Sequence, residues 1–259
     1  MHISNISGHR SASLAIEKSL REIDGGVQIK CIDGINYTSP VLEKLISKTY
    51  MSVIKRVPRL WDYLYDNKDV LRKVKRIRAL IHRLKDKKIR RLFNSFKPDI
   101  VVCTQAFPCG MVADYKRRHN LKIPLVAVLT DYAAHGYWLS DFVDLYVVPT
   151  PEIKQRLIQR GIAARRLKVL GIPVDIKFSK QGNREQAYRK LGLDSSLPVI
   201  LIMGGGQGLG PIKEIVFALD KLTTPSQLIV VCGTNKNLYR WLKKHESLFN
   251  KPAAIIRYT

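Results

Sequence analysis

The sequence predicts an α/β protein in which two Rossmann-like domains follow one another, with a long basic helical insertion in the first. Three observations support this prediction. Over most of the chain, apolar strand-like runs alternate with helical segments, which is the pattern of a parallel sheet. A glycine-rich stretch directly follows one of these apolar runs, at the place where such sheets bind ligands. Between residues 39 and 96 the alternation gives way to a helical tract crowded with basic side chains.

The first domain is expected to cover residues 1–172. A helix over residues 11–23 opens it, followed by an alternating strand over 27–32 and the helical tract over 39–96. Further strands are expected at 99–103, 125–129, 145–148 and 167–170, and further helices at 109–119 and 151–160, the last capped by Thr150 and begun by Pro151. Because a helix follows so soon after Met1, the first strand of this domain is expected to be missing.

The second domain is expected to cover residues 173–259. It follows Gly171-Ile172 and a polar stretch that runs to Gly182. Strands are expected at 199–203, 228–232 and 255–259, with helices over 212–222 and 238–245. Three strands are few for a parallel sheet covered on both faces, so we expect only the first part of a domain here.

The composition restricts the partners. Lysine and arginine number 45 against 21 acidic residues, a net charge of +24, which suits nucleic acid, acidic lipid headgroups or an anionic substrate. The four cysteines form no C-x-x-C pair, which argues against a zinc site or a disulfide framework and favours a reducing, cytoplasmic setting. The sequence has no apolar run of about 18 residues and no signal-peptide pattern, so no membrane-spanning helix is expected.

The helical tract is amphipathic. Apolar residues recur every three or four positions, and one acid, Asp86, opposes eleven basic residues: Arg72, Lys73, Lys75, Arg76, Arg78, Arg83, Lys85, Lys87, Lys88, Arg90 and Arg91. An aromatic segment over 50–65 precedes them. Such a combination is typical of attachment to an anionic membrane surface, although a solvated charged face is the alternative. The residues expected at that surface are Trp61, Tyr65, Arg76, Arg78, Lys87 and Lys88.

The glycine-rich stretch is the candidate anion site. It contains Gly204, Gly205, Gly206, Gln207 and Gly208. Backbone amides without side chains around them, at the end of a strand and before a helix, suit a phosphate. The spacing matches neither the dinucleotide-binding fingerprint nor the Walker loop. A turn that only reverses the chain is the alternative.

Two polar loops are expected at the carboxyl edge of the first sheet. His9 lies just before the first helix, where an imidazole can act as a general base. Asp131, His135 and Trp138 lie in the loop after the strand at 125–129. Together these loops predict a cleft. The alternatives are that His9 packs against the helix start, Asp131 caps a helix and Trp138 is a core aromatic.

These landmarks together resemble the monogalactosyldiacylglycerol synthase and processive diacylglycerol glucosyltransferase family, which has the two-domain GT-B architecture. The resemblance rests on Gly8-His9 with Ala12, the aromatic segment at 63–67, Thr130-Asp131 with His135 and Trp138, the stretches at 171–174 and 203–208, and the strand end at 231–233 with Asn235. The sequence departs from the family pattern at Ile6, where the family has glycine, and at Asp175, where it has arginine.

The resemblance implies that a hexose is transferred from a UDP-sugar to diacylglycerol, with inversion and without a metal or further cofactor. It implies that His9 is the base, that Asp131 or His135 orients it or shares the proton, and that the glycine loop binds the leaving diphosphate. Trp138 and the 50–65 segment would meet the acceptor lipid on the inner face of the membrane, to which the protein is peripherally bound, and no nucleic acid partner is expected.

Two other functions are open on the sequence alone. One is a related GT-B transferase that acts on a polyprenyl-linked cell-wall precursor. The other is a non-catalytic module that binds an anionic surface, either nucleic acid or lipid. The chain ends at Thr259, before the family's segments for uridine and sugar, so the donor site is expected to be truncated and the activity of this chain is left open.

Overall fold

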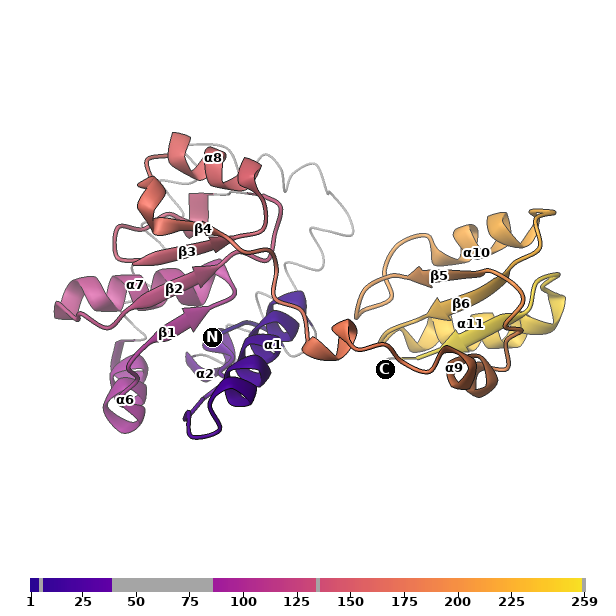
Figure 1. The fold of residues 1–259 in the computed structure, drawn as a ribbon, viewed down its shortest axis with the longest axis horizontal. Coiled ribbons are helices and arrows are strands. Elements are labelled where there is room, and N and C mark those ends of the chain that lie inside the picture. The colour runs from indigo at the N-terminus through magenta and orange to yellow at the C-terminus, as the bar shows by residue number, and fades with distance from the viewer. Residues whose placement is uncertain (5–6, 39–85, 134–135, 258–259) are drawn as a thin grey trace. The chain divides into compact units, whose positions relative to one another are not determined.

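The computed structural model describes residues 1–4, 7–38, 86–133 and 136–257. They form two compact units, residues 1–179 and 180–259, each built around a parallel β-sheet with helices (Figure 1). The predicted α/β class with two Rossmann-like parallel sheets is confirmed. Each unit has a hydrophobic core of its own. Within the described residues, no helix has the length and apolarity that spanning a membrane requires.

The sheet of the first unit has four parallel strands in the order β1-β2-β3-β4. They are β1 (Val101–Cys103), β2 (Leu125–Val128), β3 (Leu145–Val148) and β4 (Leu167–Val169). Val101 pairs with Leu125, and Val126 with Leu145. Alternate residues of β1 and β3 are buried, and β2 is buried at three of its four positions. Apolar side chains on both faces explain why these short runs could be recognised in the sequence.

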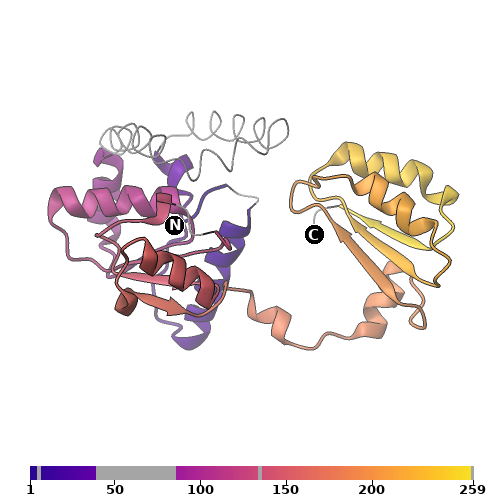
Figure 2. The same cartoon turned by 90° about the horizontal axis from the view of Figure 1, so that it is seen from above.

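Five α-helices of the first unit lie in the described residues. They are α1 (Gly8–Ile23), α2 (Gly34–Thr38), α6 (Asp86–Phe96), α7 (Ala106–His119) and α8 (Pro151–Gln159). Helices α1, α7 and α8 confirm predictions, and the hydroxyl of Thr150 caps α8 as expected. Helix α6 confirms the end of the predicted helical tract, whose residues 39–85 lie outside the described part of the chain. In Figure 2, α6 and α7 lie on one side of the first sheet and α1 on the other.

One predicted strand is wrong. Residues 27–30 alternate between half-buried and exposed, but residues 27–32 form no strand. The single bridge nearby joins His2 to Asp33, through bonds from the His2 amide to the Ile32 carbonyl and from the Gly34 amide to the His2 carbonyl, at 3.0 and 2.8 Å. A strand needs a neighbour along its length, and His2 supplies one at the end of this segment only.

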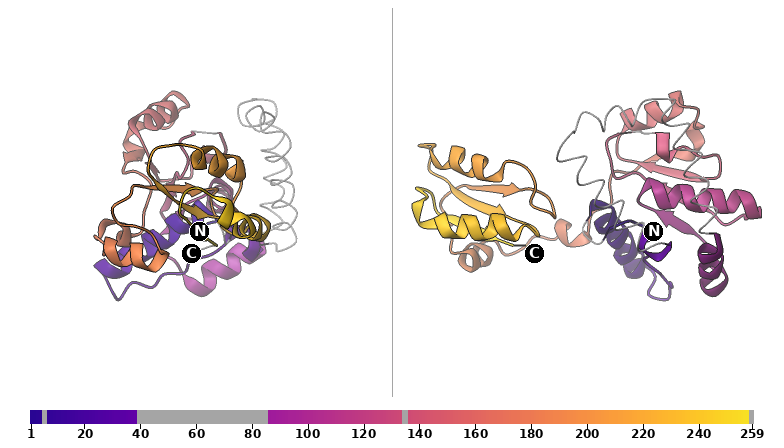
Figure 3. Two further views of the ribbon diagram at one scale, coloured as in Figure 1. Left: turned by 90° about the vertical axis from the view of Figure 1, so that its right-hand side faces the viewer. Right: turned by 180° about the vertical axis from the view of Figure 1, so that it is seen from behind.

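The second unit contains three parallel strands in the order β5-β6-β7 (Figure 3). Its elements are α9 (Arg184–Leu191), β5 (Val199–Met203), α10 (Ile212–Asp220), β6 (Gln227–Val231), α11 (Lys236–His245) and β7 (Ala253–Ile256). All except α9 were predicted. Helices α10 and α11 pack together through Phe217 and Trp241, whose ring centroids are 5.6 Å apart.

Candidate functional site

The candidate catalytic edge of the first unit lies where β1 and β2 end. Because the two strands are parallel neighbours, their carboxyl ends meet at one edge of the sheet. Thr104 directly follows β1, and Thr130 comes two residues after β2. Helix α1 begins at the same edge, with Ser7 as its N-cap, and places His9 in its first turn. Three segments far apart in the sequence therefore meet at one histidine.

His9 is held by two threonines. Its Nδ1 atom lies 3.0 Å from the carbonyl oxygen of Thr104 and 2.6 Å from the hydroxyl oxygen of Thr130. The hydroxyl of Thr104 donates back to the backbone carbonyl of His9 at 2.7 Å. The hydroxyl of Thr130 lies 3.3 Å from the Thr104 carbonyl and donates to it. The imidazole is thereby fixed in orientation while remaining half-buried.

These contacts favour one tautomer of His9. The Thr104 carbonyl oxygen only accepts, and the Thr130 hydroxyl donates to that carbonyl, so both contacts of Nδ1 are satisfied when Nδ1 carries the proton. In the neutral imidazole the lone pair then resides on Nε2. An imidazole with protonated Nδ1 and a basic Nε2 is the form that a general base requires.

The neighbouring loop contains the other predicted catalytic residues. Asp131 directly follows Thr130 and is half-buried, and His135 lies outside the described residues. Trp138 ends the short 3₁₀ helix η1 (Gly136–Trp138), and its side chain is 1% exposed within the core. The hydroxyl of Tyr146 donates to the Trp138 carbonyl at 3.1 Å. This corrects the expected lipid contact: the indole is covered by the core, so its placement is that of the alternative, a core aromatic.

The glycine loop connects β5 to α10 in the second unit. It closes on itself through bonds from the Leu209 amide to the Gly204 carbonyl at 2.8 Å and from the Gly208 amide to the Gly205 carbonyl at 3.0 Å. The loop after β6 supports it: the Thr234 amide donates to the Gly206 carbonyl at 2.9 Å, and the side-chain amide of Asn235 donates to the Gly208 carbonyl at 3.0 Å. The loops that follow the neighbouring strands β5 and β6 are therefore joined by hydrogen bonds at the carboxyl edge of this sheet.

Two close approaches require glycine here. A Cβ atom on Gly208, whose φ is +59°, would lie 2.0 Å from the Cys232 carbonyl oxygen. A Cβ atom on Gly233, whose φ is +56°, would lie 2.5 Å from the Gly206 carbonyl oxygen. The glycines thus allow the two backbones to touch, which a turn that merely reverses the chain does not need.

The tip of this loop is open. Gly205 and Gly206 are exposed, Gly204 and Gln207 are half-buried, and α10 begins after Pro211 with no side-chain cap. The first amides of a helix lack partners inside it and carry partial positive charge. An exposed glycine tip beside an uncapped helix start can bind an anion.

The exposed face of α6 is basic. Its apolar residues Ile89, Leu92 and Phe93 are buried, while Lys87 and Lys88 are exposed, as are Arg90 and Arg91. The amphipathic helix predicted from the sequence is therefore confirmed over this stretch. The other predicted surface residues, Trp61, Tyr65, Arg76 and Arg78, lie outside the described residues.

Sequence reasoning missed the role of the two threonines. Thr130 enters the sequence analysis only as the neighbour of Asp131, and Thr104 does not enter it. A threonine within two residues of the end of each of two neighbouring parallel strands is the signal that could have revealed them.

A family model described as monogalactosyldiacylglycerol (MGDG) synthase matches residues 9–174. The processive diacylglycerol beta-glucosyltransferase of Bacillus pumilus is 32% identical over 213 residues, which cover 81% of this chain and 54% of the relative. The enzyme of the same name from Bacillus cytotoxicus is 28% identical over 261 residues, covering 97% of this chain and 64% of the relative. The chain thus spans between half and two-thirds of the length of these relatives.

Among solved structures, Anabaena HepE in complex with UDP-glucose is similar with a TM-score of 0.47 and 14% identity, over 68% of this chain and 52% of that one.

Proposed function

Because this chain belongs to the MGDG synthase family, we propose that it transfers a hexose from a UDP-sugar to diacylglycerol, with inversion at the anomeric carbon. The observation that carries the proposal is the geometry of His9, whose Nδ1 atom contacts the Thr104 carbonyl and the Thr130 hydroxyl, an arrangement that favours Nε2 as the basic nitrogen. The curated relatives named above are diacylglycerol glucosyltransferases, which supports diacylglycerol as the acceptor class.

In the proposed reaction, the oxygen of the acceptor hydroxyl forms a bond to the anomeric carbon while Nε2 of His9 accepts the proton of that hydroxyl. The bond from that carbon to the diphosphate oxygen breaks, and the electron pair leaves with UDP. A single displacement of this kind inverts the anomeric carbon. The imidazolium that forms keeps the hydrogen bond from Nδ1 to the Thr104 carbonyl. We assign Asp131 or His135 to orienting His9 or to sharing the proton that Nε2 accepts.

The glycine loop of the second unit is the proposed site of the donor diphosphate. The amides at its exposed tip, Gly205 and Gly206, and those of the uncapped start of α10 would bind the diphosphate. Negative charge grows on that group as the glycosidic bond breaks, and fixed amide dipoles stabilise it without reorganisation. Glucose and galactose remain equal candidates for the transferred sugar.

The basic face of α6 supports peripheral attachment to an anionic membrane surface. Each basic residue near such a surface contributes on the order of 1 kcal/mol. The apolar side of α6 is packed in the core, so its contribution is electrostatic. Trp61, Tyr65, Arg76 and Arg78 remain proposed members of this surface.

The proposal is tested with this chain and vesicles that contain diacylglycerol and anionic lipid, supplied with radiolabelled UDP-glucose or UDP-galactose. The expected result is a labelled glycolipid, whose formation falls at least about 100-fold in His9→Ala because a general base contributes roughly that much. His245→Gln is the matched control, since His245 belongs to the second unit and stacks on Trp241.

If neither donor transfers label to the lipid, the proposed activity of this chain is contradicted. Equal transfer by His9→Ala and the unsubstituted chain removes His9 from the role of base. Activity with a polyprenyl-linked acceptor in place of diacylglycerol overturns the acceptor assignment.

A further inference from the structure

Helices α10 and α11 share an aromatic seam on the outside of the second unit. Their inner sides pack in its core, where Val216 of α10 and Leu242 of α11 are fully buried. Further out, the two helices meet through the edge-to-face contact of Phe217 with Trp241. Phe249, which follows the short 3₁₀ helix η4 (Glu246–Leu248), extends the seam, with its ring centroid 6.0 Å from that of Phe217.

This seam is only partly covered. Phe217 is 38% exposed and Leu248 is 70% exposed, while Trp241 and Phe249 are half-buried. Neighbouring apolar side chains that stay in contact with water lose the free energy that burial would supply, so they mark a surface that binds another one.

Lysines surround the seam. Lys213, one turn before Phe217 on α10, places its ammonium nitrogen 4.2 Å from the centroid of the Trp241 ring. Lys221, one turn after Phe217, and Lys244, three residues after Trp241, are both exposed. Residues three or four apart on a helix lie on the same face, so these cations flank the rings. Among the residues that the structure describes, neither Lys221 nor Lys244 takes part in an ion pair.

We call this set of side chains the α10–α11 surface. It consists of Lys213, Phe217, Lys221, Trp241, Lys244 and Leu248.

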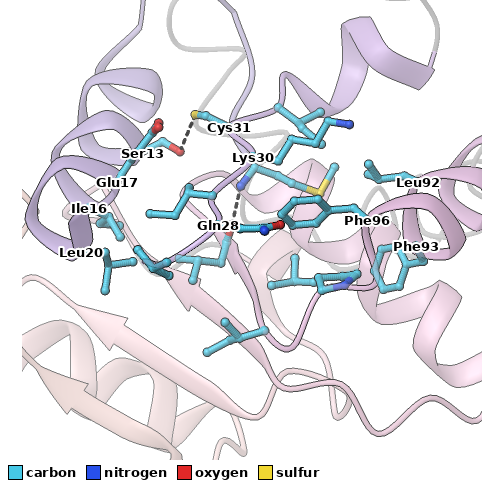
Figure 4. A pocket seen from close by; sticks show the side chains of 18 residues that line it. Ser13, Ile16, Glu17, Leu20, Gln28, Lys30, Cys31, Leu92, Phe93 and Phe96 are labelled. Atoms are coloured by element: carbon cyan, nitrogen blue, oxygen red, sulfur yellow. Dashed lines mark hydrogen bonds between the residues drawn. The ribbon is translucent and has the colours of Figure 1, made fainter. Parts of the chain in front are cut away.

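On α6, by contrast, charge and apolar side chains are separated. Leu92, Phe93 and Phe96 turn away from its basic face and line a pocket of about 160 Å³ between α6 and α1 (Figure 4). Leu20 and Ile100 remain 40% and 53% exposed, but they lie in the wall of the same recess, which a broad surface does not enter. Helix α6 can therefore attract an anionic surface without inserting into it, whereas the α10–α11 surface can do both.

This combination fits an anionic lipid bilayer. Aromatic rings and leucine enter the headgroup region, and lysine stems reach along them so that the ammonium stays at the phosphates. Nucleic acid is the other common polyanion, but bases stack on free aromatic faces. The Trp241 ring already carries Lys213 over it and stacks on His245, with the ring centroids 4.2 Å apart and the planes at 20°. The ring surface of Trp241 is thus engaged within the chain.

We propose that the α10–α11 surface is a second membrane contact, through which the second unit binds anionic lipid. It differs from α6 in combining charge with exposed apolar side chains. It goes beyond the proposed function and does not depend on it, because vesicle binding by this surface requires neither hexose transfer nor His9.

The test measures flotation of the full chain with vesicles of phosphatidylcholine and phosphatidylglycerol at low salt. It is done in a background in which glutamine replaces the exposed basic residues of α6, which are Lys87, Lys88, Arg90 and Arg91. Lys221→Gln together with Lys244→Gln should lower the partition coefficient by up to about 30-fold, because each basic residue near an anionic surface contributes about fivefold. Lys180→Gln with Lys190→Gln is the matched control, since it removes two exposed lysines elsewhere in the second unit and should change little.

A second pair of variants tests the apolar contribution. Leu248→Ser should lower the partition coefficient about fivefold, because a leucine side chain no longer leaves water on binding. Leu170→Ser is the matched control, since Leu170 is 73% exposed and belongs to the first unit. Unchanged Tm values confirm that both exposed positions tolerate serine.

Three results would overturn the proposal. One is a complete loss of flotation in the α6 background, which would leave no binding by the second unit. Another is equal partition of either variant and its matched control. The third is RNA binding in a gel shift that the Lys221 and Lys244 substitutions abolish while flotation stays unchanged, which would assign the surface to nucleic acid.

Discussion

Thr130 is the side chain on which the orientation of His9 most depends. Its hydroxyl lies 2.6 Å from Nδ1 and also reaches the Thr104 carbonyl, so it restricts the ring without touching Nε2. We expect Thr130→Val to lower kcat about five- to tenfold, the equivalent of one hydrogen bond, with KM nearly unchanged. Thr130→Ser keeps the hydroxyl and should restore most of the rate.

Steady-state kinetics with both donors measure this split between kcat and KM. A Thr130→Val variant that raises KM alone, or a Thr130→Ser variant as slow as Thr130→Val, would show that Thr130 acts by packing and not by positioning His9.

Gly208 is the tightest point of the glycine loop. We expect Gly208→Ala to destabilise the second unit by about 2–4 kcal/mol, because φ is +59° and the new Cβ would collide with the Cys232 carbonyl. Gly205→Ala is the matched control: its φ is +66°, but nothing lies within 4 Å of a Cβ there, so only about 1 kcal/mol of backbone strain is expected. Urea unfolding of both variants gives the difference, and equal losses would contradict the close contact.

At the scale of elements, the sequence predicts most of the fold because short apolar runs and capped helices carry local signals. Helix α9 was missed because eight polar-rich residues capped by Asn183 bury only Tyr188. Residues 27–32 show the opposite failure, since alternation predicts a strand but pairing depends on a neighbour. The contact of His9 with Thr104 and Thr130 spans 95 and 121 residues, so no local pattern could predict it.

The basic face of α6 should bind anionic membranes through charge. Replacing Lys87, Lys88, Arg90 and Arg91 with glutamine should lower the vesicle partition coefficient, measured by flotation on anionic lipid at low salt, by up to about 1,000-fold, because four exposed charges of about 1 kcal/mol each are lost. The control replaces four exposed basic residues of the second unit, Lys180, Arg189, Lys190 and Arg240. Raising the salt should weaken flotation of the unsubstituted chain, since screening shortens the electrostatic reach.

Equal flotation by the α6 variant and the control would make α6 an ordinary solvated face. Binding to RNA in a gel shift, with no flotation on anionic vesicles, would favour the nucleic-acid alternative.

For the whole molecule, a net charge of +24 makes every acidic contact important to stability. Asp86 at the start of α6 accepts from Arg118 at 2.6 Å and from His119 at 2.7 Å, both on α7. Burial of Asp86 raises the pKa of its carboxyl, but the hydrogen bonds from Arg118 and His119 lower it by more and hold the pKa below its usual value. Asp144 has a lowered pKa for the same reasons: burial opposes its charge, and bonds from Lys116 and the Leu125 amide outweigh that penalty.

These lowered pKa values predict the direction of the pH dependence. A carboxyl whose pKa is lower in the folded state contributes stability that is fully present above its unfolded pKa of about 3.9 and is lost as pH falls through the folded value. We therefore expect the first unit to lose stability steeply below about pH 4. Asp86→Asn should cost about 1 kcal/mol at neutral pH and should flatten this loss. Hydrogen exchange of β1 to β4 between pH 6 and pH 3 follows the first unit alone, with the second unit as internal control. A variant that keeps the full acid dependence would show that the link between α6 and α7 does not depend on the charge of Asp86.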